Sequence, residues 1–269
     1  IAIAAGVSWV TTISPLIQLG FNIKLCDCDK LNLGVDLNHL EFLCKKYNPS
    51  LLIIVHVLGH SNNLNEIRYI CKKYGVFLLE DSCEALGSKY QNLNLGTFGD
   101  AGSFSFYYGH HISTIEGGMV VTNNSELHKI MLSIRSHGWS RDMNEKDINK
   151  FREQYNVDEF RNLYTFYYPG YNLRSTDLQA FLGRSQLKKV REISKIREKN
   201  FLNYKKLLKD YYTQISLTKP ISSFAFGTFV KNRMDVFLEL KKNGIETRPL
   251  ICGNIGRHPF WLNKFQNPN

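Results

Sequence analysis

The sequence predicts an α/β protein with a largely parallel β-sheet. Short runs of consecutive apolar residues alternate with helical patterns through the first half of the chain. Strands that are apolar on both faces are typical of a parallel sheet with helices on both sides. The 269 residues are 43% hydrophobic and 22% charged. This composition is close to the globular average and excludes collagen-like, coiled-coil and wholly disordered chains.

The first half of the chain predicts four strands, three of them followed by a helix before the next strand. Continuous apolar runs of four to six residues indicate the strands, and apolar residues at helical spacing indicate the helices. Asp36 or Asn38 is expected to cap the second helix. The expected order is strand 1–5, helix 10–19, strand 22–26, helix 36–47, strand 51–56, helix 62–74 and strand 76–80.

The second half is less regular. A short aromatic segment is expected at 101–107, a strand at 119–122 and a helix at 125–136, followed by a polar surface loop at 140–165. A long helical pattern starts at Asp177, with a break expected near Lys195. Two further strands, 224–230 and 246–250, are expected around a helix at 234–242. We therefore expect a large domain over 1–195 and part of a small α+β domain over 196–269.

The chain is basic, with 34 Lys and Arg against 24 Asp and Glu, a formal charge of +10. This charge suits a nucleic acid or a phosphorylated small molecule, and it equally suits a scattered lysine surface. Six cysteines without a CxxC pair, and histidines without ligand spacing, predict no metal site. Polar residues interrupt the uncharged first 23 residues, so we expect no membrane segment and a soluble, cytoplasmic protein.

Two segments carry residues suited to catalysis. Asp81 follows an apolar strand, and ligands of parallel α/β sheets bind beyond the carboxyl ends of the strands. A carboxylate there can hold a proton on the ring nitrogen of pyridoxal phosphate, although a metal ligand, a helix cap or a solvated acid fits equally well. The hydroxyls and glycines of 103–118 can approach a phosphate. The P-loop and the Rossmann glycine fingerprint are both absent.

Three motifs in order resemble the DegT/DnrJ/EryC1/StrS family of sugar aminotransferases. They are 78–88 (LLEDSCEALGS), 96–100 (GTFGD) with 105–118, and 170–180 (GYNLRSTDLQA). The resemblance implies a pyridoxal-phosphate enzyme with the aspartate-aminotransferase-like (type I) fold, which acts on nucleotide-linked keto sugars. It also implies that the chain lacks an N-terminal segment that helps to hold the phosphate, and the last part of the small domain.

One departure from the family pattern decides the expected chemistry. Family aminotransferases carry a lysine that forms the Schiff base with the cofactor, and His110 stands at that position. Imidazole cannot form this bond, but it can move a proton near neutral pH. A histidine in place of this lysine resembles the sequence pattern of the 3-dehydratase branch of the family. It implies that His110 is the catalytic base of a 4-keto-6-deoxy-sugar dehydratase using pyridoxal or pyridoxamine phosphate.

The resemblance also implies roles for five cofactor-binding residues. Asp81 would pair with the pyridine nitrogen, and Trp9 would stack on the ring, unless it is a core tryptophan. Ser105 would bind the phosphate, and Glu84 would line the cofactor face. Asn172 would reach the phosphate in the neighbouring subunit, which makes the expected homodimer necessary for activity.

Substrate contacts are expected from Arg248, Asn254 and Arg257, and the amino donor is expected to be glutamate. CDP-linked dehydratases of this branch carry an iron–sulfur cluster on several cysteines that follow the histidine. Only Cys252 follows His110, so we expect no cluster and no partner reductase. The alternatives are an aminotransferase or inactive relative of the same family, and a polyanion-binding protein without catalysis. The aromatic residues lie mostly in apolar strands or at 104–108 rather than in a basic stripe, so we expect no nucleic-acid partner.

Overall fold

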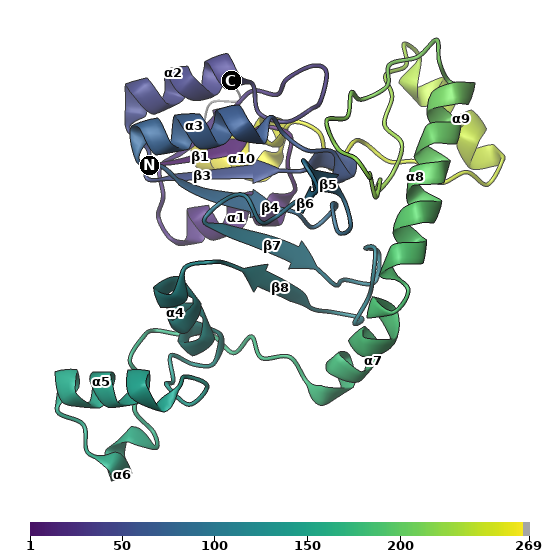
Figure 1. Ribbon diagram of the computed structural model, residues 1–269. Coiled ribbons are helices and arrows are strands. Elements are labelled where there is room, and N and C mark those ends of the chain that lie inside the picture. The colour runs from purple at the N-terminus through teal and green to yellow at the C-terminus, as the bar shows by residue number, and fades with distance from the viewer. Residues whose placement is uncertain (266–269) are drawn as a thin grey trace.

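The computed structural model describes residues 1–265, and a six-stranded sheet forms its centre (Figure 1). The strands lie in the order β2-β1-β3-β4-β7-β8. The first five are parallel, and only β8 runs antiparallel to its neighbour β7. This confirms the largely parallel sheet. The strands are β1 (Ala2–Ala5), β2 (Ile23–Cys26), β3 (Leu51–Val55), β4 (Phe77–Asp81), β7 (Ala101–Ser105) and β8 (Gly118–Val121).

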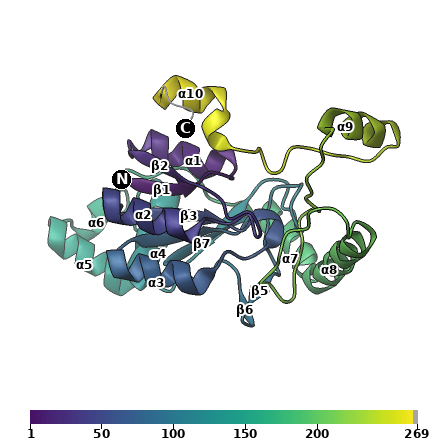
Figure 2. The ribbon, with the colours of Figure 1, turned by 90° about the horizontal axis from the view of Figure 1, so that it is seen from above.

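Helices cover both faces of the sheet, as apolar strands require. Helices α2 (Leu37–Tyr47) and α3 (Leu64–Tyr74) lie on one face, and α1 (Val10–Gln18) and α10 (Pro259–Phe265) lie on the other (Figure 2). Neighbouring residues of β1 divide between the two cores: Ile3 packs with α2 and α3, whereas Ala2 and Ala4 pack with α1 and α10. This alternation follows from the period of two of a strand.

Local signals set the ends of α2 and α3, and Asp36 is the N-cap expected for α2. The Asp36 carboxylate accepts a hydrogen bond from the His39 backbone N–H at 2.8 Å and caps α2. Helix α3 ends at Gly75, whose φ of 66° lies in the left-handed region that glycine adopts without a steric penalty.

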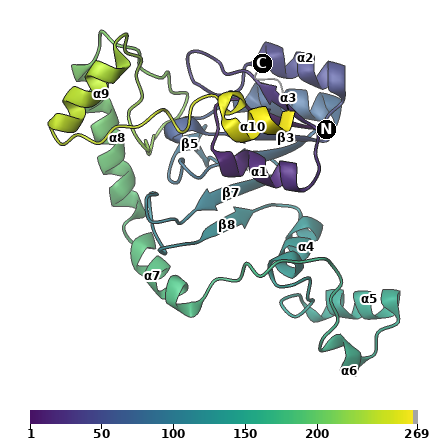
Figure 3. The ribbon, with the colours of Figure 1, turned by 180° about the vertical axis from the view of Figure 1, so that it is seen from behind.

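The remaining helices project from two sides of the sheet. Three of them extend past β8, whereas the other three lie along the opposite side (Figures 1 and 3). The first group is α4 (Ser125–Arg135), α5 (Glu145–Tyr155) and α6 (Glu159–Asn162), and the second is α7 (Asp177–Leu187), α8 (Val190–Leu207) and α9 (Arg233–Lys242). Short elements complete the fold: η1 (Val57–Gly59), β5 (Lys89–Tyr90), β6 (Leu93–Asn94) and η2 (Ile255–Arg257).

Three expectations for the second half are wrong. The segment 140–165 contains α5 and α6, which Asn144 and Asp158 cap through their side chains. The long helix breaks at Lys188–Lys189 rather than near Lys195. The segments 224–230 and 246–250 are irregular, because no strand in the described part of the chain pairs with them. Helix α8 runs through residue 195 without a break. The domain boundary expected at this residue stays a prediction.

A polar segment, which we call the inner strap (Gln214–Phe224), ties the second half to the first. The Ser61 N–H donates to Thr218 Oγ1 at 2.8 Å, and the Ser222 N–H donates to Ser88 Oγ at 2.8 Å. Ser222 and Thr218 are buried, so these bonds satisfy groups that water cannot reach. The inner strap therefore has a defined position against the loops that follow β3 and β4.

No helix among residues 1–265 is both long and apolar enough to cross a membrane.

A buried histidine next to η1 should make the protein acid-sensitive. Burial, aided by the charge of Lys205, lowers the pKa of His60 to about 3. The unfolded chain therefore binds a proton below about pH 6.5 that the folded chain excludes, and stability falls as the pH drops. We expect His60→Gln to remove about 1–2 kcal/mol of the stability difference between pH 7 and pH 5. Urea unfolding at both pH values measures it, with exposed His128→Gln as control. The same pH dependence in His60→Gln and wild type would contradict the assignment.

Candidate active site

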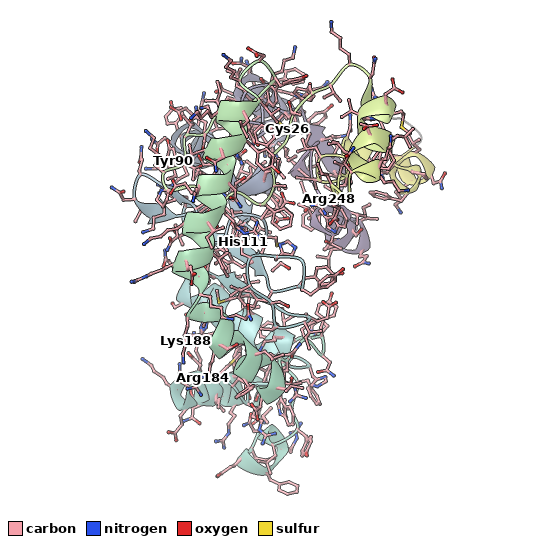
Figure 4. All side chains as sticks on the ribbon, turned by 90° about the vertical axis from the view of Figure 1, so that its right-hand side faces the viewer. Cys26, Tyr90, His111, Arg184, Lys188 and Arg248 are labelled. Atoms are coloured by element: carbon pink, nitrogen blue, oxygen red, sulfur yellow. The ribbon has the colours of Figure 1, made fainter. Side chains whose placement is uncertain are left out.

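The predicted site residues gather mainly where the parallel strands end. Asp81 is the last residue of β4, between β3 and β7, and Ser105 is the last residue of β7. Figure 4 views the molecule from this side, where His111 and Arg248 are labelled. The loop between β7 and β8 carries His110 and His111 across this end of the sheet.

The Asp81 carboxylate is held by two donors. Thr12 Oγ1 donates to Oδ2 at 2.7 Å, and the Cys83 backbone N–H donates to Oδ1 at 3.1 Å. Each oxygen accepts one hydrogen bond from the protein and retains a lone pair for another donor. Trp9 lies at the N-cap position of α1, one helical turn before Thr12, and its indole is exposed. An oriented carboxylate therefore stands near an exposed aromatic ring.

Glu84 is almost fully buried beside this carboxylate. The Leu58 backbone N–H donates to its Oε2 at 2.9 Å, and Arg248 Nη2 lies 3.4 Å from its Oε1. Burial raises the pKa of Glu84 to about 7, and the charge of Asp81 adds to this rise, whereas the Leu58 N–H and Arg248 oppose it. Glu84 can therefore hold or release a proton near neutral pH.

The hydrogen bond of His110 defines its tautomer. Its Nδ1 lies 2.7 Å from the Cys83 carbonyl oxygen, which can only accept, so Nδ1 carries the proton. The lone pair is consequently on Nε2. Burial lowers the pKa of His110, and the charges of Arg248 and Arg197 act in the same direction. His110 is thus a neutral imidazole with a free basic nitrogen at neutral pH.

His111 points elsewhere and has a structural environment. Its side chain is 5% exposed, and Nε2 donates to the Ser222 carbonyl oxygen of the inner strap at 2.8 Å. Burial lowers its pKa to about 4, although the Ser222 hydrogen bond opposes this shift. Only one of the two adjacent histidines is therefore available as a base, as expected for neighbouring residues of a loop.

The other predicted residues differ in how close they lie to this centre. Ser105 Oγ accepts from the Tyr107 N–H at 3.2 Å at the start of the loop. Arg248 reaches the centre through Glu84, and Asn254 uses its Oδ1 to accept from the Gly256 N–H in η2. Arg257 is exposed in η2.

Asn172 lies away from the other site residues. It is exposed and forms a β-bridge with Ser136 at the end of α4. Helix α4 and the β7–β8 loop lie at opposite ends of β8 (Figure 1). A single chain therefore does not bring Asn172 to Asp81.

Sequence reasoning missed three side chains at this centre. Thr12 orients Asp81, Phe224 packs against His110 with ring centroids 5.1 Å apart, and Arg197 donates to the Phe224 carbonyl oxygen at 3.0 Å. Thr12 is 69 residues from Asp81 in sequence, so no local pattern connects them. Within residues 1–265, no group of three or more His, Cys, Asp and Glu side chains could hold a metal ion.

Comparison with known proteins identifies the family. The model of the DegT/DnrJ/EryC1/StrS aminotransferase family matches residues 2–269. The GDP-4-keto-6-deoxy-D-mannose 3-dehydratase of Yersinia pseudotuberculosis is 36% identical over 260 residues, which cover 94% of this chain and 65% of that protein. The chain thus spans slightly less than two thirds of this relative.

Solved structures agree with this result. A GDP-4-keto-6-deoxymannose-3-dehydratase mutant with bound GDP-perosamine has a TM-score of 0.88 at 33% identity. The same enzyme with a trapped PLP-glutamate geminal diamine has a TM-score of 0.86 at 33% identity. Each match covers 98% of this chain, with 69% and 68% of the respective solved chains. The similarity confirms the aspartate-aminotransferase-like fold, and the chain belongs to the DegT/DnrJ/EryC1/StrS aminotransferase family.

Proposed function

We propose that this chain is the main part of a pyridoxal-phosphate-dependent 3-dehydratase that acts on a nucleotide-linked 4-keto-6-deoxy sugar. One observation carries the proposal: the β7–β8 loop presents His110 as a neutral base, and no lysine occurs between Lys89 and Lys129. Amino transfer, the alternative within the family, depends on an amine at this position. The similarity to GDP-linked 3-dehydratases supports GDP as the nucleotide.

The residues at the strand ends fit pyridoxal or pyridoxamine phosphate. Asp81 has free acceptor capacity for a pyridine N–H, and the Trp9 indole is exposed for stacking on a ring. Ser105 would contribute to phosphate binding, and Glu84 would line the same face. When bound, the cofactor supplies an amine that condenses with the C4 ketone and a ring that accepts electrons. Asp81 stabilises the protonated ring nitrogen that this chemistry requires.

His110 moves the protons. Its Nε2, as the neutral base, would accept a proton from the C4′ carbon of the bound cofactor and would then deliver a proton to the C3 hydroxyl oxygen, which leaves as water. One imidazole can serve both steps because an unperturbed imidazole has a pKa of about 6.5, so both of its forms are accessible to proton transfer. Glutamate is the proposed amino donor, and the PLP–glutamate adduct of the solved relative supports it.

The substrate carries a diphosphate, and the basic residues near the site suit it. Arg248 touches Glu84 with only one nitrogen at 3.4 Å, so its remaining N–H groups are available to a phosphate. Arg257 and Asn254 lie on η2 and extend this surface. Six free cysteines fit a reducing compartment, which supports a cytoplasmic location.

A homodimer with shared active sites would complete the centre. Asn172 does not reach Asp81 within one chain, and α7, which follows Asn172, exposes Phe181 (71%) and Leu178 (66%). The edge strand β8 exposes Met119 and Val120. Exposed apolar residues on an edge strand and a helix are typical of a surface that another chain covers. These features support a second copy as the source of Asn172.

His110→Asn should abolish C3–O cleavage, because asparagine cannot accept a proton at this position. We expect at least a hundredfold loss of dehydration. Mass spectrometry of the sugar product measures it in the full-length protein. Cofactor binding, measured by absorbance, should be retained, and the exposed His128→Asn should behave as wild type. Dehydration near the wild-type rate in His110→Asn would contradict the proposal.

Borohydride reduction should leave no cofactor attached to wild-type protein, because position 110 has no amine. His110→Lys should gain an adduct at position 110, which peptide mass analysis would locate. It should also shift the enzyme towards amino transfer at C4. A phosphopyridoxyl group on any lysine of the wild-type protein would refute the base assignment.

Mixed dimers should reveal the shared site. His110→Asn and Asn172→Ala chains should each be inactive alone. A heterodimer should contain one intact site if Asn172 acts in the neighbouring subunit, so a random mixture should regain about a quarter of the wild-type activity. Activity after co-refolding or co-expression is the measurement. No recovery, with heterodimers shown to form, would mean that Asn172 does not act across the interface.

A further inference from the structure

The Phe224 ring contacts four functional groups at once. Its centroid lies 5.1 Å from that of His110 and 5.8 Å from that of His111. The guanidinium carbons of Arg248 and Arg197 lie 5.5 Å and 5.9 Å from the same centroid. Phe224 thus joins the proposed base to a cation proposed to bind substrate.

The backbone of Phe224 is fixed on both sides. Its N–H donates to the Leu58 carbonyl oxygen at 2.9 Å, and Arg197 Nη1 donates to its carbonyl oxygen at 3.0 Å and to that of Ser223 at 3.1 Å. His111 anchors the neighbouring Ser222 from the other direction. The ring therefore has a set position at the end of the inner strap.

His110 needs such a support. Its hydrogen bond to the Cys83 carbonyl holds only Nδ1, and this leaves the tilt of the ring to its packing. Phe224 packs against the ring at an interplanar angle of 37°, and Tyr107 meets it edge-on with centroids 6.3 Å apart. Because Tyr107 is exposed, Phe224 is the more constrained neighbour.

We propose that Phe224 is a positioning residue that holds the His110 ring and the Arg248 guanidinium in place for dehydration. The proposal rests on the proposed function, since the orientation of His110 Nε2 matters for dehydration only if His110 is the base. A planar aromatic face can orient an imidazole and attract a guanidinium at the same time. An aliphatic side chain of similar size would keep the packing and lose the cation–π attraction.

The charges around His110 set its pKa, and the proposal therefore predicts a change in the pH dependence of the rate when the Phe224 ring is removed. Asp81 faces it from β4 and raises its pKa, whereas Arg248 and Arg197 lower it. Glu84 and His111 are the other titratable neighbours, and the exposed Tyr107 lies at the ring edge. Burial is the largest influence and lowers the pKa of His110. Removing the Phe224 ring admits water, so that pKa rises and the acid limb of the rate profile moves to higher pH.

The test compares three variants of the full-length protein. Phe224→Ala should raise the pKa of His110, read by NMR of labelled histidine without substrate, and lower kcat/KM about tenfold to a hundredfold. Phe224→Leu should preserve the histidine titration and raise KM several-fold, because Arg248 loses its aromatic support. Phe226→Ala is the matched control, since that ring stacks on Tyr204 of α8 with centroids 5.0 Å apart. It should change neither quantity.

The outcomes separate this proposal from the function on which it rests. An unchanged His110 titration in folded Phe224→Ala would overturn the positioning role. If that variant does not fold, an unchanged KM in Phe224→Leu would overturn it instead. A shifted titration together with full dehydration by His110→Asn would support the positioning role and refute His110 as the base.

Discussion

A buried carboxylate organises the end of the sheet where the site lies. Glu80 has no exposed surface, and its oxygens accept hydrogen bonds from His56 Nε2 at 2.9 Å and from the Gly96 N–H at 2.9 Å. The Phe98 and Gly99 N–H groups add two more, at 2.6 Å each. Burial raises the pKa of Glu80, but these partners, led by His56, outweigh burial and lower the pKa overall. A buried carboxylate without them would be strongly destabilising.

This network also determines where Asp81 points. Neighbouring residues of a strand face opposite sides of the sheet, so holding Glu80 on one side directs Asp81 to the other. The same carboxylate holds the loop before β7 through the Gly96, Phe98 and Gly99 N–H groups. This loop determines where β7 begins, and β7 leads into the loop that carries the two histidines. Asp81 and His110, the proposed cofactor-binding acid and the proposed base, therefore depend on one structural glutamate whose side chain is held by His56 and three backbone N–H groups instead.

The sequence predicted the parts of the structure that depend on local patterns. Apolar periodicity located the strands and helices of the first half, and the position of Asp81 after a strand placed it at the site. Thr12, Arg197 and Phe224 were missed because their contacts join segments far apart in the chain. The apolar residues of 224–230 resemble a strand locally, but the segment instead provides Phe224 at the end of the inner strap and pairs with no strand among the described residues. The region 140–165 is so polar that its sequence predicts a loop rather than the capped helices α5 and α6.

An imidazole in place of an amine at position 110 requires surroundings that keep it unprotonated. A base must be neutral at working pH, and the arginines proposed to suit a diphosphate also lower the pKa of His110. The proposed substrate binding and the neutral form of His110 therefore favour the same residues. Asp81 opposes them, because a negative charge that stabilises a pyridinium also stabilises an imidazolium. Burial against Phe224 favours the neutral form despite Asp81. The Phe224 ring thus helps His110, the proposed base, to stay neutral although it lies near Asp81, the carboxylate proposed to hold the cofactor.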